Sequence, residues 1–319
     1  MTDFKADKNR TLCYAILEDK SPVVIPGPAI GASTFMEGAS GLLSTIDDVM
    51  VLYSAYMAVI KDQTERGTNS TMGNPFKECT TLISGHDFLG NSTSLREQAY
   101  GCAWVRSQLP GPLGMLSMHM KLMQVEPKNV MPNATEGSPS RLCLYHQGLM
   151  PGSSANVAFL PETDTIVAVL VNACPLGDGA DWISQTIMEV IYDSPIRHDY
   201  KSLAREATAK FLDHLPLLKC IEEENRVPGT KPSFPLEEYA GKYHNDITTF
   251  WIEIAVVGDC LSICFMGVEM ETHELRHYQD DTFTWMRSFN EAAQRGSFVH
   301  YYDAVHYLIR FAKDDQGIR

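Results

Sequence analysis

A short polar group interrupts the most apolar part of this chain. His146, Gln147 and Gly148 follow the apolar residues 142–145 and are the polar groups at the mouth of a predicted core. An imidazole titrates near neutral pH, so a His in such a place can move protons for a reaction. A single His at a strand end is also a common structural residue. We therefore take His146 as the candidate for chemistry and keep the structural alternative open.

A second segment of the sequence matches a metal-site motif. His273-Glu274-Leu275-Arg276-His277 reads H-E-x-x-H, which on a helix places two His one turn apart and a Glu near metal-bound water. The surrounding residues alternate and favour a strand, where the two His would be about 13 Å apart at ~3.3 Å per residue. No third ligand motif follows. We therefore predict no metal site and keep a zinc metalloprotease as the weaker alternative.

The elements around His146 are predicted to form a β-meander. Residues 142–146 and 153–160 read as strands separated by a Gly- and Pro-containing break that begins at Gly148. The Val/Ile/Leu run at 166–171 is typical of a central strand that is covered on both faces.

Helices and further strands are expected on both sides of the meander. A helix is predicted from Ser44, as its N-cap, to about Lys61, because apolar residues recur there at helical spacing. The remaining predictions are a strand at 99–109, helices at 181–192 and 201–214, and strands at 251–256, 261–265, 274–278, 282–286 and 298–311.

The composition is that of a folded acidic protein. The chain has 319 residues, 44% hydrophobic and 21% charged, which allows one large or two modest domains. A formal net charge of −14 argues against nucleic acid or an anionic membrane as partner, because both need clustered Lys and Arg. No apolar run reaches the roughly 18–20 residues of a membrane span, and the polar start predicts no signal peptide. We expect a cytoplasmic protein.

Four segments occur in the same order in a known family. They are GLLSTIDDVMVLYSAYM at 41–57, AYGCAWV at 99–105, YHQGLMPGSSANVAFLPETDTIVAVLVN at 145–172 and LEEYAGKYHND at 236–246. The chain resembles fungal proteins similar to serine β-lactamases, the penicillin-binding-protein-like family of hydrolases and acyl transferases also called peptidase family S12. The resemblance covers nearly the whole chain. It implies an α+β fold, with a partial β-lactamase-like antiparallel sheet flanked by helices and a small C-terminal antiparallel sheet or barrel.

The resemblance also implies three active-site motifs, and this chain carries the third. The motifs are Ser-x-x-Lys with the nucleophile, Tyr-x-Asn or Tyr-x-Ser, and Lys-Thr-Gly or His-x-Gly. His146-Gln147-Gly148 matches the last of these. By resemblance, His146 is catalytic and faces the site, Gly148 lets a substrate lie along the strand, and the backbone N–H of Leu149 is an oxyanion donor.

The first two motifs have no match in the expected place. No Ser lies three residues before a Lys, and Ser117 to Lys121 is one residue too long. Tyr200-Lys201-Ser202 and Tyr243-His244-Asn245 fit the second motif, but they follow the third motif instead of preceding it. The nucleophile is therefore unassigned. The resemblance further implies that the helix with Ser-x-x-Lys is missing, and that a partner chain could complete the fold.

These observations lead to one prediction and one alternative. We predict a β-lactamase-like domain at 1–219, a linker at 220–235 and an all-β domain at 236–319. The expected activity, by resemblance, is hydrolysis or acyl transfer on a small-molecule ester, amide or thioester in a fungal secondary-metabolite pathway, without a cofactor. The alternative is a pseudoenzyme that binds a metabolite or a partner subunit without turnover.

Overall fold

The chain is organised as two compact units of mixed α and β structure. The computed structural model describes residues 10–27, 43–89, 98–117, 131–296, 304–314 and 317–318. One unit, here the central unit, comprises 43–149 and 153–211. The other, the terminal unit, comprises 150–152, 212–319 and the part of the chain before Leu43, as far as these are described. Each unit is described by itself below.

The central unit contains a six-stranded sheet and its helices. The sheet strands, in chain order, are β3 (Asp87–Phe88), β4 (Gln98–Tyr100), β5 (Val105–Leu109), β8 (Arg141–Met150), β9 (Ser153–Leu160) and β10 (Thr165–Val171). The helices are α2 (Ile46–Arg66), α3 (Cys79–Ile83), α5 (Gly179–Ile191) and the first half of α6 (Tyr200–Glu224). Short strands are β6 (Gly111–Pro112), β7 (Asn133–Ala134) and β11 (Ala173–Cys174).

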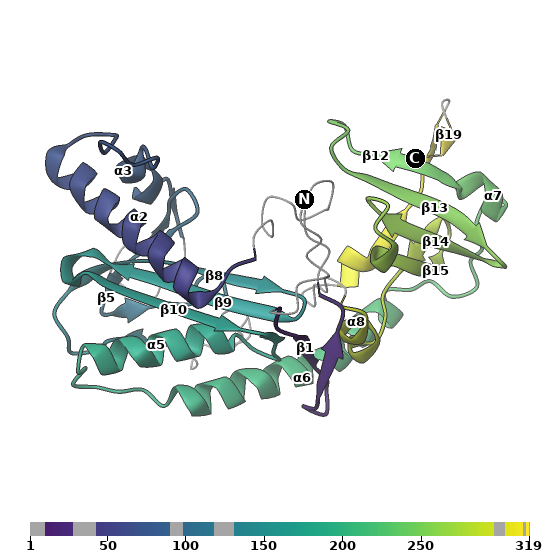
Figure 1. The fold of residues 1–319 in the computed structure, drawn as a ribbon. Coiled ribbons are helices and arrows are strands. Elements are labelled where there is room, and N and C mark those ends of the chain that lie inside the picture. The colour runs from purple at the N-terminus through teal and green to yellow at the C-terminus, as the bar shows by residue number, and fades with distance from the viewer. Residues whose placement is uncertain are drawn as a thin grey trace. The chain divides into compact units, whose positions relative to one another are not determined.

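The spatial order of the sheet places His146 on an inner strand. The order is β10-β9-β8-β5-β4-β3, and the β10–β9, β8–β5, β5–β4 and β4–β3 pairs are antiparallel. Helix α5 packs on one face and α2 on the other, as Figure 1 shows. The fold class is therefore α+β, with an antiparallel sheet flanked by helices, as predicted.

Strand alternation divides the core of this unit into two layers. Cys143 and Tyr145 of β8 are buried in the layer that contains Met188 of α5. Leu144, between them, is buried in the layer that contains Ile60 of α2. Because successive residues of a strand point to opposite faces, His146 continues the α2 side of β8 and the next residue continues the α5 side.

Helix α2 begins one residue later than predicted. Its N-cap is Thr45, whose Oγ1 accepts the N–H of Asp48 at 3.2 Å, so the predicted cap Ser44 is wrong. A Thr in extended conformation can accept an N–H at the third helical position as well as a Ser can. The helix also continues to Arg66, where Gly67 adopts φ 61° and ends it in the left-handed conformation.

Three strand predictions need correction. Residues 99–109 form two antiparallel strands, β4 and β5, because Gly101 and the residues after it make a turn. Strand β8 does not end at His146, where its end was predicted, but continues through Gly148 to Met150, because Gly keeps the backbone N–H and C=O groups that a ladder uses. Strand β10 is an edge strand and not a central one; α2 and α5 cover its two faces, which explains the apolar run.

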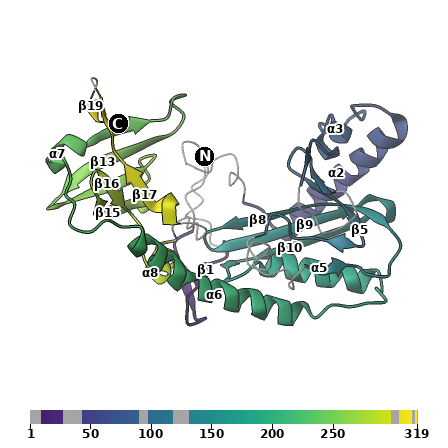
Figure 2. The ribbon, with the colours of Figure 1, turned by 180° about the vertical axis from the view of Figure 1, so that it is seen from behind.

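The terminal unit is built around a second six-stranded sheet, seen from behind in Figure 2. Its strands, in spatial and chain order, are β12 (Gly241–His244), β13 (Trp251–Val257), β14 (Cys260–Phe265), β15 (Thr272–Gln279), β16 (Thr282–Thr284) and β17 (Leu308–Arg310). Its other elements are β1 (Cys13–Ile16), β2 (Pro22–Ile25), the second half of α6, α7 (Leu236–Tyr239), α8 (Phe289–Arg295), β18 (Lys313–Asp314) and β19 (Gly317–Ile318). The predicted C-terminal antiparallel sheet is confirmed.

The boundaries within this unit differ in detail from the sequence prediction. Helix α6 runs to Glu224, so the first five residues of the expected 220–235 linker are helical. Within the expected strand 298–311, β17 is limited to Leu308–Arg310, and 298–303 lie outside the described residues. Helix α8 was not predicted; a capping box of Ser288 and Glu291 starts it. The domain limits at 219 and 236 stay a prediction.

Helix length and hydropathy bear on membrane insertion. Among the described helices, none combines the length and the apolar character that a membrane span requires.

Candidate active site

The predicted catalytic His lies near the end of β8 with both ring nitrogens engaged. Nδ1 of His146 is 2.6 Å from the carbonyl oxygen of Gln147, and Nε2 is 3.1 Å from the hydroxyl of Tyr100. A carbonyl can only accept, so Nδ1 carries the proton of the neutral ring. Nε2 is then the acceptor for the Tyr100 O–H. This tautomer leaves the Nε2 lone pair directed at a hydroxyl, which is the geometry of a base and its proton donor.

The environment of His146 keeps the ring neutral. Burial disfavours the imidazolium and lowers the pKa of His146 from its ordinary value of 6.5, and the hydrogen bond to the Gln147 carbonyl only partly opposes this. At neutral pH the ring is therefore an acceptor at Nε2. A neutral imidazole next to a hydroxyl is competent to take a proton from it, as a general base does.

Tyr100 was not identified from the sequence, although it lies in the segment AYGCAWV. The strand order brings it to His146: Tyr100 pairs with Val105 across β4–β5, and Val105 pairs with Tyr145 across β5–β8. The two partners are 46 positions apart in sequence, and nothing in their spacing indicates the contact. No fixed sequence spacing relates Tyr100 to His146, because a hairpin and a long connection separate β4 from β8.

A buried polar network holds the other side of the same strand. Asp181 on α5 is 1% exposed, and its Oδ1 accepts the Gln147 side-chain N–H at 2.8 Å and that of Asn156 at 3.0 Å. Its Oδ2 accepts from Gln185 at 2.7 Å. A buried carboxylate is tolerated when donors surround it. The network ties β8 and β9 to α5, and so fixes the backbone at the residue after His146.

Gly148 and Leu149 lie where the strand is open to solvent. Both are exposed, Leu149 to 37%. A Cβ added at Gly148 would meet Ala155 at 3.8 Å, an ordinary van der Waals distance. Packing therefore does not require a Gly at this position. The suggested role, in which a substrate lies against the strand at Gly148 with the Leu149 N–H as donor, stays a prediction.

The hydroxyls singled out by motif searches are used elsewhere. Ser117 donates to Asp178 at 2.7 Å and is buried, while Lys121 lies outside the described residues. Tyr200 donates to Glu189 at 2.8 Å, and Tyr243 donates to a backbone carbonyl at 2.8 Å in the terminal unit. Neither Tyr is hydrogen-bonded to His146. Among the described residues, the hydroxyl bonded to His146 is that of Tyr100.

The H-E-x-x-H segment lies on a strand, as predicted. His273 and His277 are both in β15, and His273 is 2% exposed with its ring 4.9 Å from that of Trp285. The His277 ring bonds the Asp280 carbonyl at 2.8 Å. Within the described part of the chain, no group of three His, Cys, Asp or Glu side chains is arranged to hold a metal ion. The helical geometry that this motif needs for zinc is not present in β15.

Comparison with known proteins gives a family match for part of the chain and similarity to a solved structure. Residues 225–318 match the family described as "Domain of unknown function (DUF3471)". No curated protein matches the sequence. Among solved structures, the octameric penicillin-binding protein homologue from Pyrococcus abyssi is similar, with 13% sequence identity and a TM-score of 0.37. The alignment covers 88% of this chain and 47% of that protein, so this chain spans about half of its length.

Proposed function

We propose that this chain is a β-lactamase-like hydrolase or acyltransferase homologue that acts on a small-molecule ester, amide or thioester. The observation that carries the proposal is the contact of His146 Nε2 with the Tyr100 hydroxyl on an inner strand of a helix-flanked antiparallel sheet. The His-x-Gly segment stands on that strand, as the sequence resemblance implies.

Each residue has a stated part in the proposed reaction. As the unassigned nucleophile attacks the acyl carbon, its proton passes through the Tyr100 hydroxyl to Nε2 of His146. His146 returns this proton to the alcohol, amine or thiol that leaves when the acyl bond breaks. Gly148 gives the acyl group room beside the strand, and the Leu149 N–H stabilises the negative charge that develops on the acyl oxygen. The nucleophile is not assigned. A fungal secondary-metabolite pathway, a cytoplasmic location and a partner chain that supplies a further helix remain parts of the proposal.

Activity-based labelling tests this proposal on the full chain. A fluorophosphonate probe is expected to label one residue, identified by peptide mass spectrometry, and p-nitrophenyl acetate is expected to be hydrolysed. His146→Ala should abolish both, and Tyr100→Phe should reduce hydrolysis, while the melting temperature stays nearly unchanged because His146 is only partly buried. Hydrolysis at the wild-type rate in His146→Ala would contradict the assignment.

A second candidate is a binding protein without turnover. It is favoured by one observation: both nitrogens of His146 are occupied, and no Ser, Thr or Cys side chain among the described residues bonds to the ring. Nucleophilic catalysis needs such a pair. Absence of labelling and hydrolysis in a folded, monodisperse sample would favour this candidate.

A further inference from the structure

The terminal unit contains a cavity that the proposed reaction does not use. It has a volume of about 830 Å³ and lies between the second half of α6 and strands β15 and β16. All of its lining residues belong to the terminal unit. Sites for small molecules have volumes of about 300–1,000 Å³. Part of its wall is apolar, formed by Leu215, Leu218, Met286 and Phe289.

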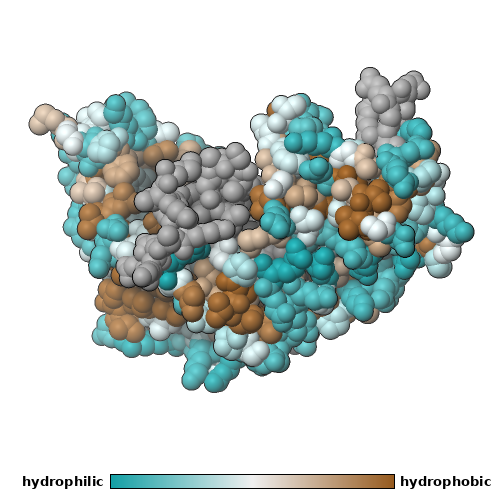
Figure 3. Space-filling model, turned by 45° about the vertical axis from the view of Figure 1, so that its right-hand side comes forward, coloured by the Kyte–Doolittle hydropathy of each residue, from teal (hydrophilic) through white to brown (hydrophobic). Residues whose placement is uncertain are grey.

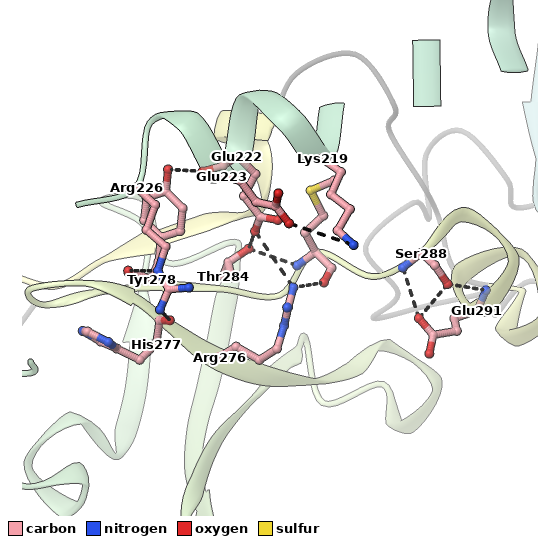
Figure 4. Close-up of polar contacts among 11 residues, drawn as sticks. Lys219, Glu222, Glu223, Arg226, Arg276, His277, Tyr278, Thr284, Ser288 and Glu291 are labelled. Carbon is pink, nitrogen blue, oxygen red and sulfur yellow. Dashed lines mark hydrogen bonds and ion pairs between the residues drawn. The ribbon is translucent and has the colours of Figure 1, made fainter. Parts of the chain in front are cut away.

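A buried carboxylate with a spare oxygen lines this cavity. Glu222 on α6 is 9% exposed, and its Oε1 accepts the Thr284 hydroxyl at 2.6 Å (Figure 4). Among the described residues, no hydrogen-bond donor or cation contacts its Oε2. Burying a carboxylate is unfavourable unless donors or a cation surround it. The second oxygen can therefore accept an N–H group from a ligand in the cavity.

A guanidinium lies beside this carboxylate in a long ion pair. Arg276 Nη2 is 4.0 Å from Glu222 Oε1, an ion pair drawn in Figure 4 that is too long for a hydrogen bond. The same nitrogen donates to the Met286 carbonyl at 2.7 Å. The Arg276 side chain is 57% exposed. A guanidinium has five N–H donors, so this one keeps donors for a second anion. Among lining residues of both charges, the cavity thus presents a buried carboxylate and a guanidinium next to each other.

The nearest alternatives fit these two groups less well. A simple anion would be attracted by Arg276 but repelled by the buried carboxylate of Glu222. A simple cation would meet Glu222 and leave Arg276 unused. An α-amino acid zwitterion satisfies both, because its ammonium and its carboxylate are attached to the same carbon atom. We propose that this cavity binds an α-amino acid with an apolar side chain, whose ammonium donates to Glu222, whose carboxylate accepts from Arg276, and whose side chain packs on Leu215 and Phe289.

Calorimetric titration of the full chain with three matched probes tests the proposal. L-Phenylalanine carries both charges, phenethylamine lacks the carboxylate, and 3-phenylpropionate lacks the ammonium. L-Phenylalanine is expected to bind saturably at one site and more tightly than either fragment. 3-Phenylpropionate is expected to bind most weakly, because it brings a second anion to Glu222. Absence of saturable binding by L-phenylalanine would overturn the proposal.

Paired variants separate this site from general charge effects. Glu222→Gln should weaken L-phenylalanine and phenethylamine by about tenfold or more, since a charge-assisted hydrogen bond is lost. Glu224→Gln is the matched control, since Glu224 lies on the same helix, is exposed and does not line the cavity; it should leave both affinities unchanged. Equal effects of the two substitutions would contradict the assignment.

Two further variants keep the test valid if Glu222→Gln fails to fold. Arg276→Met should weaken L-phenylalanine about tenfold and leave phenethylamine unchanged, because only the carboxylate contact is removed. Leu215→Trp should obstruct the apolar wall of the cavity and weaken binding, with the folded state verified by urea unfolding. Binding of L-phenylalanine that is unaffected by Leu215→Trp would place the amino acid elsewhere and reject this cavity.

Discussion

His146 shows how two hydrogen bonds define the chemistry of one side chain. The Gln147 carbonyl places the proton on Nδ1, and the Tyr100 hydroxyl then faces a lone pair on Nε2. Neither partner is charged, and burial lowers the pKa of His146. The ring is therefore a neutral acceptor over the pH range in which an unburied His begins to take up protons.

The lowered pKa of His146 predicts a pH dependence of stability. Between 6.5, its ordinary value, and the lower value in the folded state, the unfolded chain binds a proton that the folded chain does not. The free energy of unfolding should therefore fall as the pH falls through this window, and the loss is complete below the folded pKa. Urea unfolding at several values between pH 8 and pH 5 measures it.

The control for this pH effect is the variant without the imidazole. His146→Ala should lose less stability than the wild type between pH 8 and pH 5, since other His contribute equally to both proteins. Resonances of the His146 ring followed by NMR should titrate below 6.5. Parallel pH profiles of the wild type and His146→Ala would show that burial does not suppress protonation of this ring.

Asp181, the buried carboxylate behind β8, should contribute more to stability than an exposed carboxylate does. Asp181→Asn replaces an acceptor oxygen by an amide donor among the side-chain donors of Gln147, Asn156 and Gln185. The expected loss is about 2–3 kcal/mol in the free energy of unfolding, because hydrogen bonds to a charged group are removed. Asp193→Asn is the control: Asp193 is 94% exposed, so about 0.5 kcal/mol or less is expected. Equal losses would mean that the network is not stabilising.

At the scale of elements, the start of α2 distinguishes two neighbouring hydroxyls. Thr45→Ala removes the side chain that accepts the Asp48 N–H and should cost about 1 kcal/mol in the free energy of unfolding. Ser44→Ala should have almost no effect, because among the described residues the Ser44 hydroxyl is bonded only to the Thr45 carbonyl, at 3.4 Å. Chemical denaturation of both variants decides between them. A larger loss of stability in Ser44→Ala than in Thr45→Ala would show that Ser44 is the N-cap, as the sequence predicted.

Strand β8 is the element that joins the chemistry to the core. Its successive residues alternate between the two layers, so that His146 and Gln147 have different environments although they are adjacent. On one face of the strand, the Gln147 side chain donates to Asp181. On the other face, the Tyr100 hydroxyl contacts His146. A shift of register by one residue would exchange these environments and destroy both contacts.

At the scale of the whole molecule, each unit has a hydrophobic core of its own. Phe159 is fully buried against α2 in the central unit, and Phe283 is 2% exposed in the core of the terminal sheet. Phe159→Ala should lower the stability of the central unit by about 3–5 kcal/mol and leave the terminal sheet unchanged, and Phe283→Ala should do the reverse.

The Trp residues report on the two units separately. Trp104 and Trp182 lie in the central unit, and Trp251 and Trp285 in the terminal unit. Replacing one pair by Phe leaves fluorescence from the other unit alone during urea unfolding. Each core substitution should then shift one transition and not the other. A single transition that moves for both pairs of reporters would show that the chain unfolds as one cooperative body.

Exposed apolar side chains occur in both units. Figure 3 shows hydrophobic residues in several separate patches on one face of the molecule. On α2 they include Val51, 71% exposed, and on α5 Val190, 56% exposed. Both helices use their opposite sides to cover the central sheet. The helix expected from a partner chain therefore has apolar surface available to it, and its presence stays a prediction.

Local patterns in the sequence were sufficient for most elements. The periodicity of 46–60 predicts α2, and the alternation around His273 and His277 predicts a strand despite the H-E-x-x-H motif. The C-terminal sheet follows from the order of such elements, whereas the α+β class was implied by the resemblance to a known family. These features depend on residues within a few positions of one another, where side-chain spacing directly reflects the geometry of helix or strand.

Tertiary structure alone decided which residues meet. The contact of Tyr100 with His146 depends on the order of β4, β5 and β8 in the sheet, and β10 is an edge strand although its composition is that of an inner one. The Glu222 carboxylate has a hydrogen-bonded oxygen inside the cavity only because Thr284, 62 positions away, is folded against it. Such pairings are set by how strands and helices pack. A sequence pattern reflects only neighbouring residues, so it does not show which distant segments pack together.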